Sequence, residues 1–216
     1  MSYSQYIQFR NVHLIFWSVS MKKRIVSFLV NLLALVLLLG GKGCDKSPTK
    51  SPSPNAPYFP LAVGNVWQYT QVEIGNSTVS ILDTHMVEDT IYYRRITYYP
   101  KRDDTTANQL YRMQDSLVYR RIDDTEYLYL NFTKPLGVPW QQRPYDRLAH
   151  IESRDLEWEV PAGTFNGCVQ VVSAGELDST VTIYAPNVGR IYSHSFYKKG
   201  AVIGGIRQLL EYNLQQ

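Results

Sequence analysis

The sequence predicts an all-β domain: a single antiparallel, strongly curved sheet of about 10–11 strands, with at most one or two short helices. Two observations lead to this fold class. Short runs of apolar, aromatic and polar residues with strand-like alternation recur through residues 58–216, separated by turn-forming residues. No segment in this range has a clear helical period with caps. A half-barrel, a barrel and a sandwich all fit this pattern.

Turn signals place the individual strands. Gly75-Asn76, Asp115-Ser116 and Asp123-Asp124 separate neighbouring runs, and the last two predict a three-stranded meander. Two segments could be helical instead, 148–158 and 207–214. The expected strands are 66–72, 78–82, 91–99, 110–113, 117–122, 126–132, 151–154, 156–160, 169–174, 180–184, 190–196 and 206–213.

The N-terminal part predicts an export signal over residues 21–43. Basic residues at 22–24 precede an apolar run at 25–39, the length of a signal-peptide core. A membrane-spanning helix needs about 20 apolar residues, and here Gly40-Gly41-Lys42 ends the run early. Residues 1–20 are expected to be a miscalled start or an atypical extension, since Met21 begins a more typical signal. An uncleaved N-terminal anchor stays open.

Up to Cys44 this segment resembles a bacterial lipoprotein signal. The resemblance implies that Cys44 is acylated and tethers the protein to a membrane. The alternative is that Cys44 is an ordinary residue near the end of a signal peptide. Lys42 departs from the usual pattern of small residues before the cysteine, so cleavage elsewhere remains an alternative. Residues 44–57 form a Pro/Ser-rich linker that cannot bury a core. The location expected is the cell envelope, at the inner or the outer membrane.

The charge of the chain excludes one class of partner. Five of the 22 basic residues and none of the 19 acidic residues precede Cys44, which leaves 17 basic and 19 acidic residues, a net charge of −2. Nucleic-acid binding needs a concentrated basic face, so no nucleic acid is expected. A lipid or a protein remains as a possible partner besides the membrane, and the oligomeric state is left open.

Candidate catalytic residues are few. Cys168 lies in an apolar run without an adjacent histidine, which favours a buried thiol over a nucleophile. A carboxylate-rich stretch around Trp158 could supply a glycosidase-like acid and nucleophile, but on a strand it is more typical of a solvated face. The histidines His85, His150 and His194 are too dispersed for a metal site. We therefore expect no catalytic residue, metal or cofactor.

Four motifs with proline or glycine beside an aromatic residue form the expected framework. They lie at 58–69, 134–140, 160–165 and 184–191, where proline and glycine set turns and the aromatic residue plugs the sheet. Their aromatic side chains also give a candidate ligand-binding set, against the alternative that they serve only the core. That set is Trp67, Tyr69, Trp140, Trp158 and Phe165.

The order of three motifs resembles a group of uncharacterised bacterial envelope lipoproteins. The resemblance rests on Pro60-Leu61 to Tyr69, on Val160-Pro-Ala-Gly-Thr-Phe165 and on Tyr184-Ala-Pro to Gly189. Asn187 stands where glycine is expected, and asparagine tolerates the left-handed turn. The general look of a curved sheet behind an anchor is also similar to half-barrel lipid or lipoprotein carriers. Neither likeness implies a catalytic activity.

Three functions follow as hypotheses. The leading one is a non-enzymatic, membrane-anchored envelope lipoprotein that binds an apolar ligand or a protein partner on its curved sheet. The second is a purely structural or interaction module that uses the sheet edges or the loops around 134–147. The third is a hydrolase of envelope glycans, which rests on Glu152, Glu157 and Glu159.

Overall fold

The computed structural model describes residues 57–72, 74–197 and 205–215, all of which belong to one compact unit, Ser47–Gln216. The expected signal at 21–43, the acylation candidate Cys44 and the linker up to residue 56 lie outside the described residues. Across the part of the chain that is described, no helix has the length and apolar character needed to cross a membrane.

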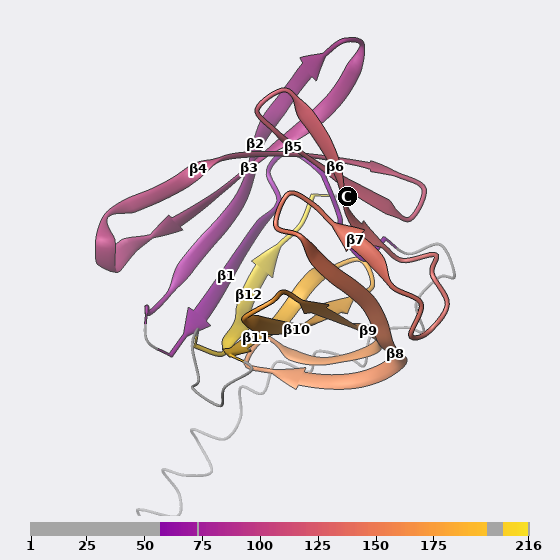
Figure 1. Cartoon of the computed structure of the whole chain (residues 1–216). Coiled ribbons are helices and arrows are strands. Elements are labelled where there is room, and N and C mark those ends of the chain that lie inside the picture. Colours follow the sequence, from indigo (N-terminus) through magenta and orange to yellow (C-terminus); the bar gives the residue numbers. More distant parts are fainter. Residues whose placement is uncertain (1–56, 73, 198–204, 216) are drawn as a thin grey trace, which may run out of the picture. The chain divides into compact units, whose positions relative to one another are not determined.

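The described chain folds into one antiparallel sheet that is nearly closed into a barrel (Figure 1). The strands follow the chain around the sheet in the order β6-β5-β4-β3-β2-β1-β12-β11-β10-β9-β8-β7, so the first and last strands pair in the middle. The strands are β1 Val66–Gln71, β2 Ser77–Val87, β3 Thr90–Tyr99, β4 Asp104–Gln114, β5 Leu117–Ile122, β6 Thr125–Asn131, β7 Trp140–Gln142, β8 Arg147–Val160, β9 Gly163–Ala174, β10 Asp178–Ala185, β11 Gly189–Tyr197 and β12 Arg207–Asn213. A short 3-10 helix, Pro100–Arg102, joins β3 to β4.

The predicted fold class is confirmed, and two details of the prediction are wrong. Neither segment 148–158 nor segment 207–214 is helical, because the first lies in β8 and the second is almost entirely β12. The expected strands 151–154 and 156–160 are one bulged strand, in which Asp155 takes a left-handed φ of 57°. Bulges interrupt the two-residue alternation, which explains why the pattern here looked irregular.

Two edge strands, β6 and β7, meet where the barrel would close (Figure 1). Side chains of β7 reach across this gap in place of a backbone ladder. Trp140 Nε1 and Gln142 Nε2 both donate hydrogen bonds to the carbonyl of Tyr129, at 3.4 and 2.7 Å. The carbonyl of Tyr129, on the edge strand β6, is therefore paired.

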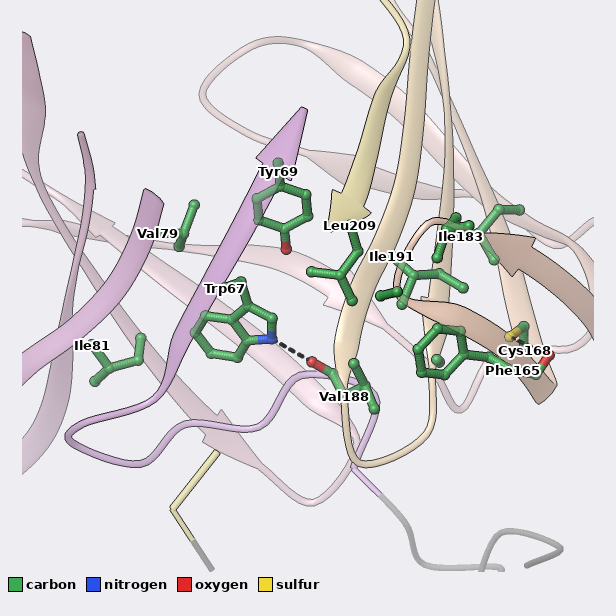
Figure 2. Packing of buried hydrophobic residues seen from close by; sticks show 13 residues of the cluster. Trp67, Tyr69, Val79, Ile81, Phe165, Cys168, Ile183, Val188, Ile191 and Leu209 are labelled. Atoms are coloured by element: carbon green, nitrogen blue, oxygen red, sulfur yellow. Dashed lines mark hydrogen bonds between the residues drawn. The ribbon is translucent and has the colours of Figure 1, made fainter. Parts of the chain in front are cut away.

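Buried side chains inside the sheet form two clusters. The first cluster comprises Trp67, Tyr69, Val79, Ile81, Val160, Ala162, Phe165, Cys168, Ile183, Ala185, Val188, Ile191 and Leu209. The second cluster comprises Tyr111, Val118, Leu130, Phe132, Trp140, Ala149, Ile151, Val169, Val171 and Tyr184. The first cluster is drawn in Figure 2. Burial of these side chains supplies the main driving force for closing the sheet.

Trp67 is the polar anchor of the first cluster, and its replacement tests the closure. Its buried indole Nε1 donates to the carbonyl of Val188 at 2.7 Å (Figure 2). In the variant Trp67→Phe this carbonyl is left without its partner, so we expect a loss of about 1–3 kcal/mol in the free energy of unfolding. Urea denaturation of the unit Ser47–Gln216 measures the change. The control Trp158→Phe, at a half-buried residue, should lose less; equal losses would contradict this role of Trp67.

Candidate functional site

The first and last sequence motifs meet at one end of the first cluster. Besides the bond between Trp67 and Val188, the Tyr69 hydroxyl donates to the carbonyl of Arg190 at 2.8 Å. Gly189 lies against the ring of Pro60, where an added Cβ would come within 3.2 Å of Cδ. Asn187 has a φ of 61°, which confirms the left-handed turn predicted for it. These two motifs thus form a single structural joint.

The middle motif docks on the same cluster from β8 and β9. Ala162 N donates to the carbonyl of Leu209 at 3.1 Å, and the Phe165 ring lies 6.0 Å from that of Tyr212. Cys168 Sγ donates to the carbonyl of Phe165 at 3.4 Å (Figure 2). These three motifs therefore contribute to one core, as the turn-and-plug framework predicts, whereas the fourth motif, 134–140, places Trp140 in the second cluster.

A small cavity remains beside this joint. Its volume is about 20 Å³, the room needed by roughly one water molecule. Apolar and aromatic side chains make up most of its wall, and two guanidinium groups complete it. The lining residues are Phe59, Pro60, Leu61, Trp67, Tyr69, Val79, Ile81, Arg95, Gly189 and Arg190.

One wall of this cavity comes from the segment that precedes the sheet. We call residues 57–62 the entry segment; its side chains pack against both clusters. The Tyr58 hydroxyl donates to the carbonyl of Gly167 at 3.0 Å, and its ring lies 5.1 Å from that of Phe132. The Phe59 ring lies 5.3 Å from that of Tyr111. The barrel interior is thus filled partly by a segment outside the strands.

The structure separates the five aromatic residues proposed as a ligand-binding set. Trp67 and Tyr69 line the cavity. Phe165 belongs to the same cluster but not to the cavity wall, and Trp140 belongs to the second cluster. Trp158 is half-buried, with its ring 5.2 Å from that of Tyr192. Sequence reasoning missed three residues of the cavity wall, Phe59, Arg95 and Arg190. Phe59 lies before the first strand, and a charged residue in a strand pattern is usually expected to face solvent.

The carboxylates proposed for hydrolysis do not form an enclosed site. Glu152, Asp155, Glu157 and Glu159 are all exposed, with Trp158 between them turned toward the core. Glu152 pairs with His150, Nε2 to Oε2 at 2.9 Å. The acid and nucleophile of a glycosidase flank a bound sugar, and this exposed strand face offers no such enclosure. Within the described ranges, no cluster of three His, Cys, Asp or Glu side chains could hold a metal ion.

A larger and more polar cavity, of about 560 Å³, lies over β2 to β5. Arg94 pairs there with Asp83, and hydrogen bonding from Arg94 holds the pKa of Asp83 below its usual value. The remaining lining residues are Thr84, His85, Gln109, Leu110, Arg120, Arg121, Ile122 and Asp123. Mixed charge in this cavity favours a polar occupant over an apolar one.

Comparisons with known proteins give structural neighbours only. No protein-family model and no curated protein matches the chain. A crystal structure described as an exported protein with a YmcC-like fold, from Bacteroides fragilis, matches with 12% identity and a TM-score of 0.49. One described as a lipoprotein, from Parabacteroides distasonis, matches with 12% identity and a TM-score of 0.45. Each match covers 74% of this chain and 100% of the other.

The thiol of Cys168 provides a test of how tightly the first cluster is closed. Burial raises the pKa of Cys168 to about 12, so at pH 8 only about one thiol in ten thousand is ionised. We expect iodoacetamide to leave the folded unit Ser47–Gln216 almost unlabelled at pH 8 and to label it fully in urea, as followed by mass spectrometry. Labelling of the folded protein should still rise with pH up to pH 10. Equal rates in both states would contradict the burial.

Proposed function

We propose that the protein is a non-enzymatic, lipid-anchored binding protein of the cell envelope, and that its ligand places an apolar group inside the barrel beside Trp67. Acylation of Cys44 and membership in the envelope lipoprotein group that the motif order resembles are parts of this proposal. The observation that carries it is the entry segment. Phe59 and Leu61, which belong to no strand, occupy apolar space inside the sheet.

The size of the cavity decides how such a ligand would enter. A volume of about 20 Å³ cannot hold an acyl chain or a ring, so the ligand must take the place of side chains. Phe59 and Leu61 are only half-buried, whereas Trp67 and Val79 on the strands are fully buried. Withdrawing the entry segment leaves every backbone ladder intact. It is therefore the part of the interior that a ligand can displace at the lowest cost.

The first test looks for the ligand itself. The full chain is expressed in a bacterial envelope, extracted in detergent and examined by native mass spectrometry. A co-purifying hydrophobic molecule, bound at a fixed ratio, is the expected result. A protein that carries no small molecule and takes up none from an envelope lipid extract would contradict the proposal.

Replacing Phe59 tests the position of the ligand. In Phe59→Ala the cavity gains the space of a phenyl ring, so we expect tighter binding of the neutral probe N-phenyl-1-naphthylamine, by about tenfold. The same change should lower the free energy of unfolding by about 2 kcal/mol. Probe fluorescence and urea denaturation measure the two effects. Val63→Ala, at an exposed residue just after the entry segment, is the matched control. Unchanged binding in Phe59→Ala would contradict this position.

A protein partner is the second candidate, because apolar side chains are exposed near β7. Leu136, Val138, Tyr145 and Leu148 are 56%, 39%, 59% and 53% exposed, and they flank the strand at the sheet edge. Edges of this kind can pair with another chain. Replacing Leu136 and Leu148 with serine should abolish a stable complex isolated from the envelope, and persistence of the complex would argue against this surface.

A further inference from the structure

Four arginines direct their side chains toward the barrel interior without an acidic partner. They are Arg95 on β3, Arg120 on β5, Arg190 on β11 and Arg207 on β12. The rings over which they lie include Tyr69 and Tyr111, which are 2% and 1% exposed. Arg120 also lies 5.5 Å from the ring centroid of Tyr145, which is 59% exposed. No carboxylate of the described residues pairs with any of the four. We call these four residues the arginine group.

Several other arginines of the same sheet pair with carboxylates, among them Arg94, Arg112 and Arg147. Arg94, next to Arg95, pairs with Asp83, and Arg112 makes a two-point contact with Glu126. Arg147 pairs with Asp178 at 2.6 Å. Carboxylates thus accompany Arg94, Arg112 and Arg147, whereas tyrosine rings and no carboxylate lie beside the arginine group.

Tyrosine rings and neutral acceptors hold the arginine group in place. The guanidinium carbons of Arg190 and Arg207 lie 5.2 and 5.0 Å from the Tyr69 ring centroid. Those of Arg95 and Arg120 lie 5.7 and 6.0 Å from the Tyr111 centroid. Cation–π contacts of this kind position a guanidinium group without cancelling its charge.

Several donors of this group have no acceptor. Nε and Nη2 of Arg190, Nε of Arg120 and Nε of Arg207 are buried and make no hydrogen bond within the described part of the chain. Arg207 Nη2 does donate to Ser77 Oγ, at 2.7 Å. Burial, followed by the positive charge of Arg190, lowers the pKa of Arg207 to about 10. Buried donors without partners and repelling like charges both destabilise the ligand-free barrel.

The arginine group links the two cavities. Arg95 and Arg190 line the small apolar cavity, whereas Arg120 and Gln109 line the larger polar one. Gln109 also accepts a hydrogen bond from Arg95 Nη1, at 3.5 Å. A ligand that bound here would thus find cationic donors beside an apolar wall, and a polar cavity next to them.

We propose that the arginine group is a binding site for an oxyanion, a carboxylate or phosphate group carried by the ligand. Guanidinium groups match the geometry of these anions and donate two hydrogen bonds to one anion at a time. An anion supplies both things that the site lacks, a negative charge and acceptors for the orphaned donors. If the ligand is an amphiphile whose apolar part displaces Phe59, the inference rests on the proposed function. The oxyanion site itself does not depend on it.

The experiment uses the unit Ser47–Gln216, which contains all twelve strands and both clusters. Isothermal titration calorimetry compares three probes: octyl phosphate, inorganic phosphate and 1-octanol. We expect octyl phosphate to bind the wild type and to raise its unfolding temperature. In Arg190→Gln and in Arg95→Gln its affinity should fall at least about tenfold, since each removes charged hydrogen bonds to the anion. Arg112→Gln, at an arginine already paired with Glu126, should leave the affinity unchanged.

Stability without ligand separates a binding role from a structural one. Arg190→Gln removes an unneutralised buried charge, so we expect this variant to unfold at a higher temperature than the wild type. Arg112→Gln breaks an ion pair and should unfold at a lower temperature. An Arg190→Gln protein that is less stable and binds octyl phosphate as the wild type does would overturn the inference. Should one of the two binding variants fail to fold, the other gives the same comparison.

The three probes distinguish the possible sources of the anion. If inorganic phosphate binds as tightly as octyl phosphate, the oxyanion site stands and the apolar ligand of the proposed function falls. If octanol binds as tightly as octyl phosphate and the arginine variants change nothing, the inference falls and the apolar ligand stands. Binding of no probe overturns the inference. Preference for octyl phosphate over both other probes supports an anionic amphiphile.

Discussion

The hydrogen bond from Trp67 to the carbonyl of Val188 is the constraint on which the rest of the barrel depends. It joins β1, the first strand of the chain, to the turn between β10 and β11. In the sheet, β1 leads through β2 toward β6, and its neighbour β12 leads through β11 toward β7. Pro60 and Gly189 make room for each other beside this bond. Asn187, next to Val188, donates its N–H to the carbonyl of Pro57 at 2.8 Å, so the same turn also holds the start of the entry segment.

The interior that results is unusual in how it is filled. The strands contribute both apolar clusters, and Phe59 from the entry segment and guanidinium groups from four strands pack beside them. Well-packed apolar residues in place of buried charged groups are often neutral or stabilising in proteins. Uncompensated charge inside a core is typical of a site where stability is given up for binding.

Much of the fold could be predicted from particular residues. Alternation in 66–72, and turns at Asp115 and Asp123, where φ is 54° and 51°, set the hairpins as expected. Asn187 takes the left-handed conformation that its place in the motif predicts. β8 was harder, since its three register shifts disturb the period from which a strand is recognised. The three residues of β7 are too few to show any period.

The candidate site could be predicted only in part, for a physical reason. Trp67 and Tyr69 are aromatic, and their residue type alone predicts burial. Arg95 and Arg94 are neighbours in the sequence, yet Arg95 lines the cavity whereas Arg94 pairs with Asp83. Bulges in β2 and β4, the strands on either side of β3, set this arrangement, and the sequence does not reveal a bulge of this kind. Tyr69 and Tyr111, which lie under the inward-facing arginines, are the signal that could have found them.

The position of the entry segment along the chain has a mechanical consequence. Pro57, the first described residue, accepts a hydrogen bond from Asn187 N at 2.8 Å, and Tyr58 and Phe59 follow it immediately. A pulling force applied from the N-terminal side reaches this bond, the bond from the Tyr58 hydroxyl to Gly167 and these two rings before it reaches any strand. Isolated hydrogen bonds yield at a lower load than a ladder of them pulled in parallel. Tension from that side would therefore unseat Phe59 while the barrel keeps its shape.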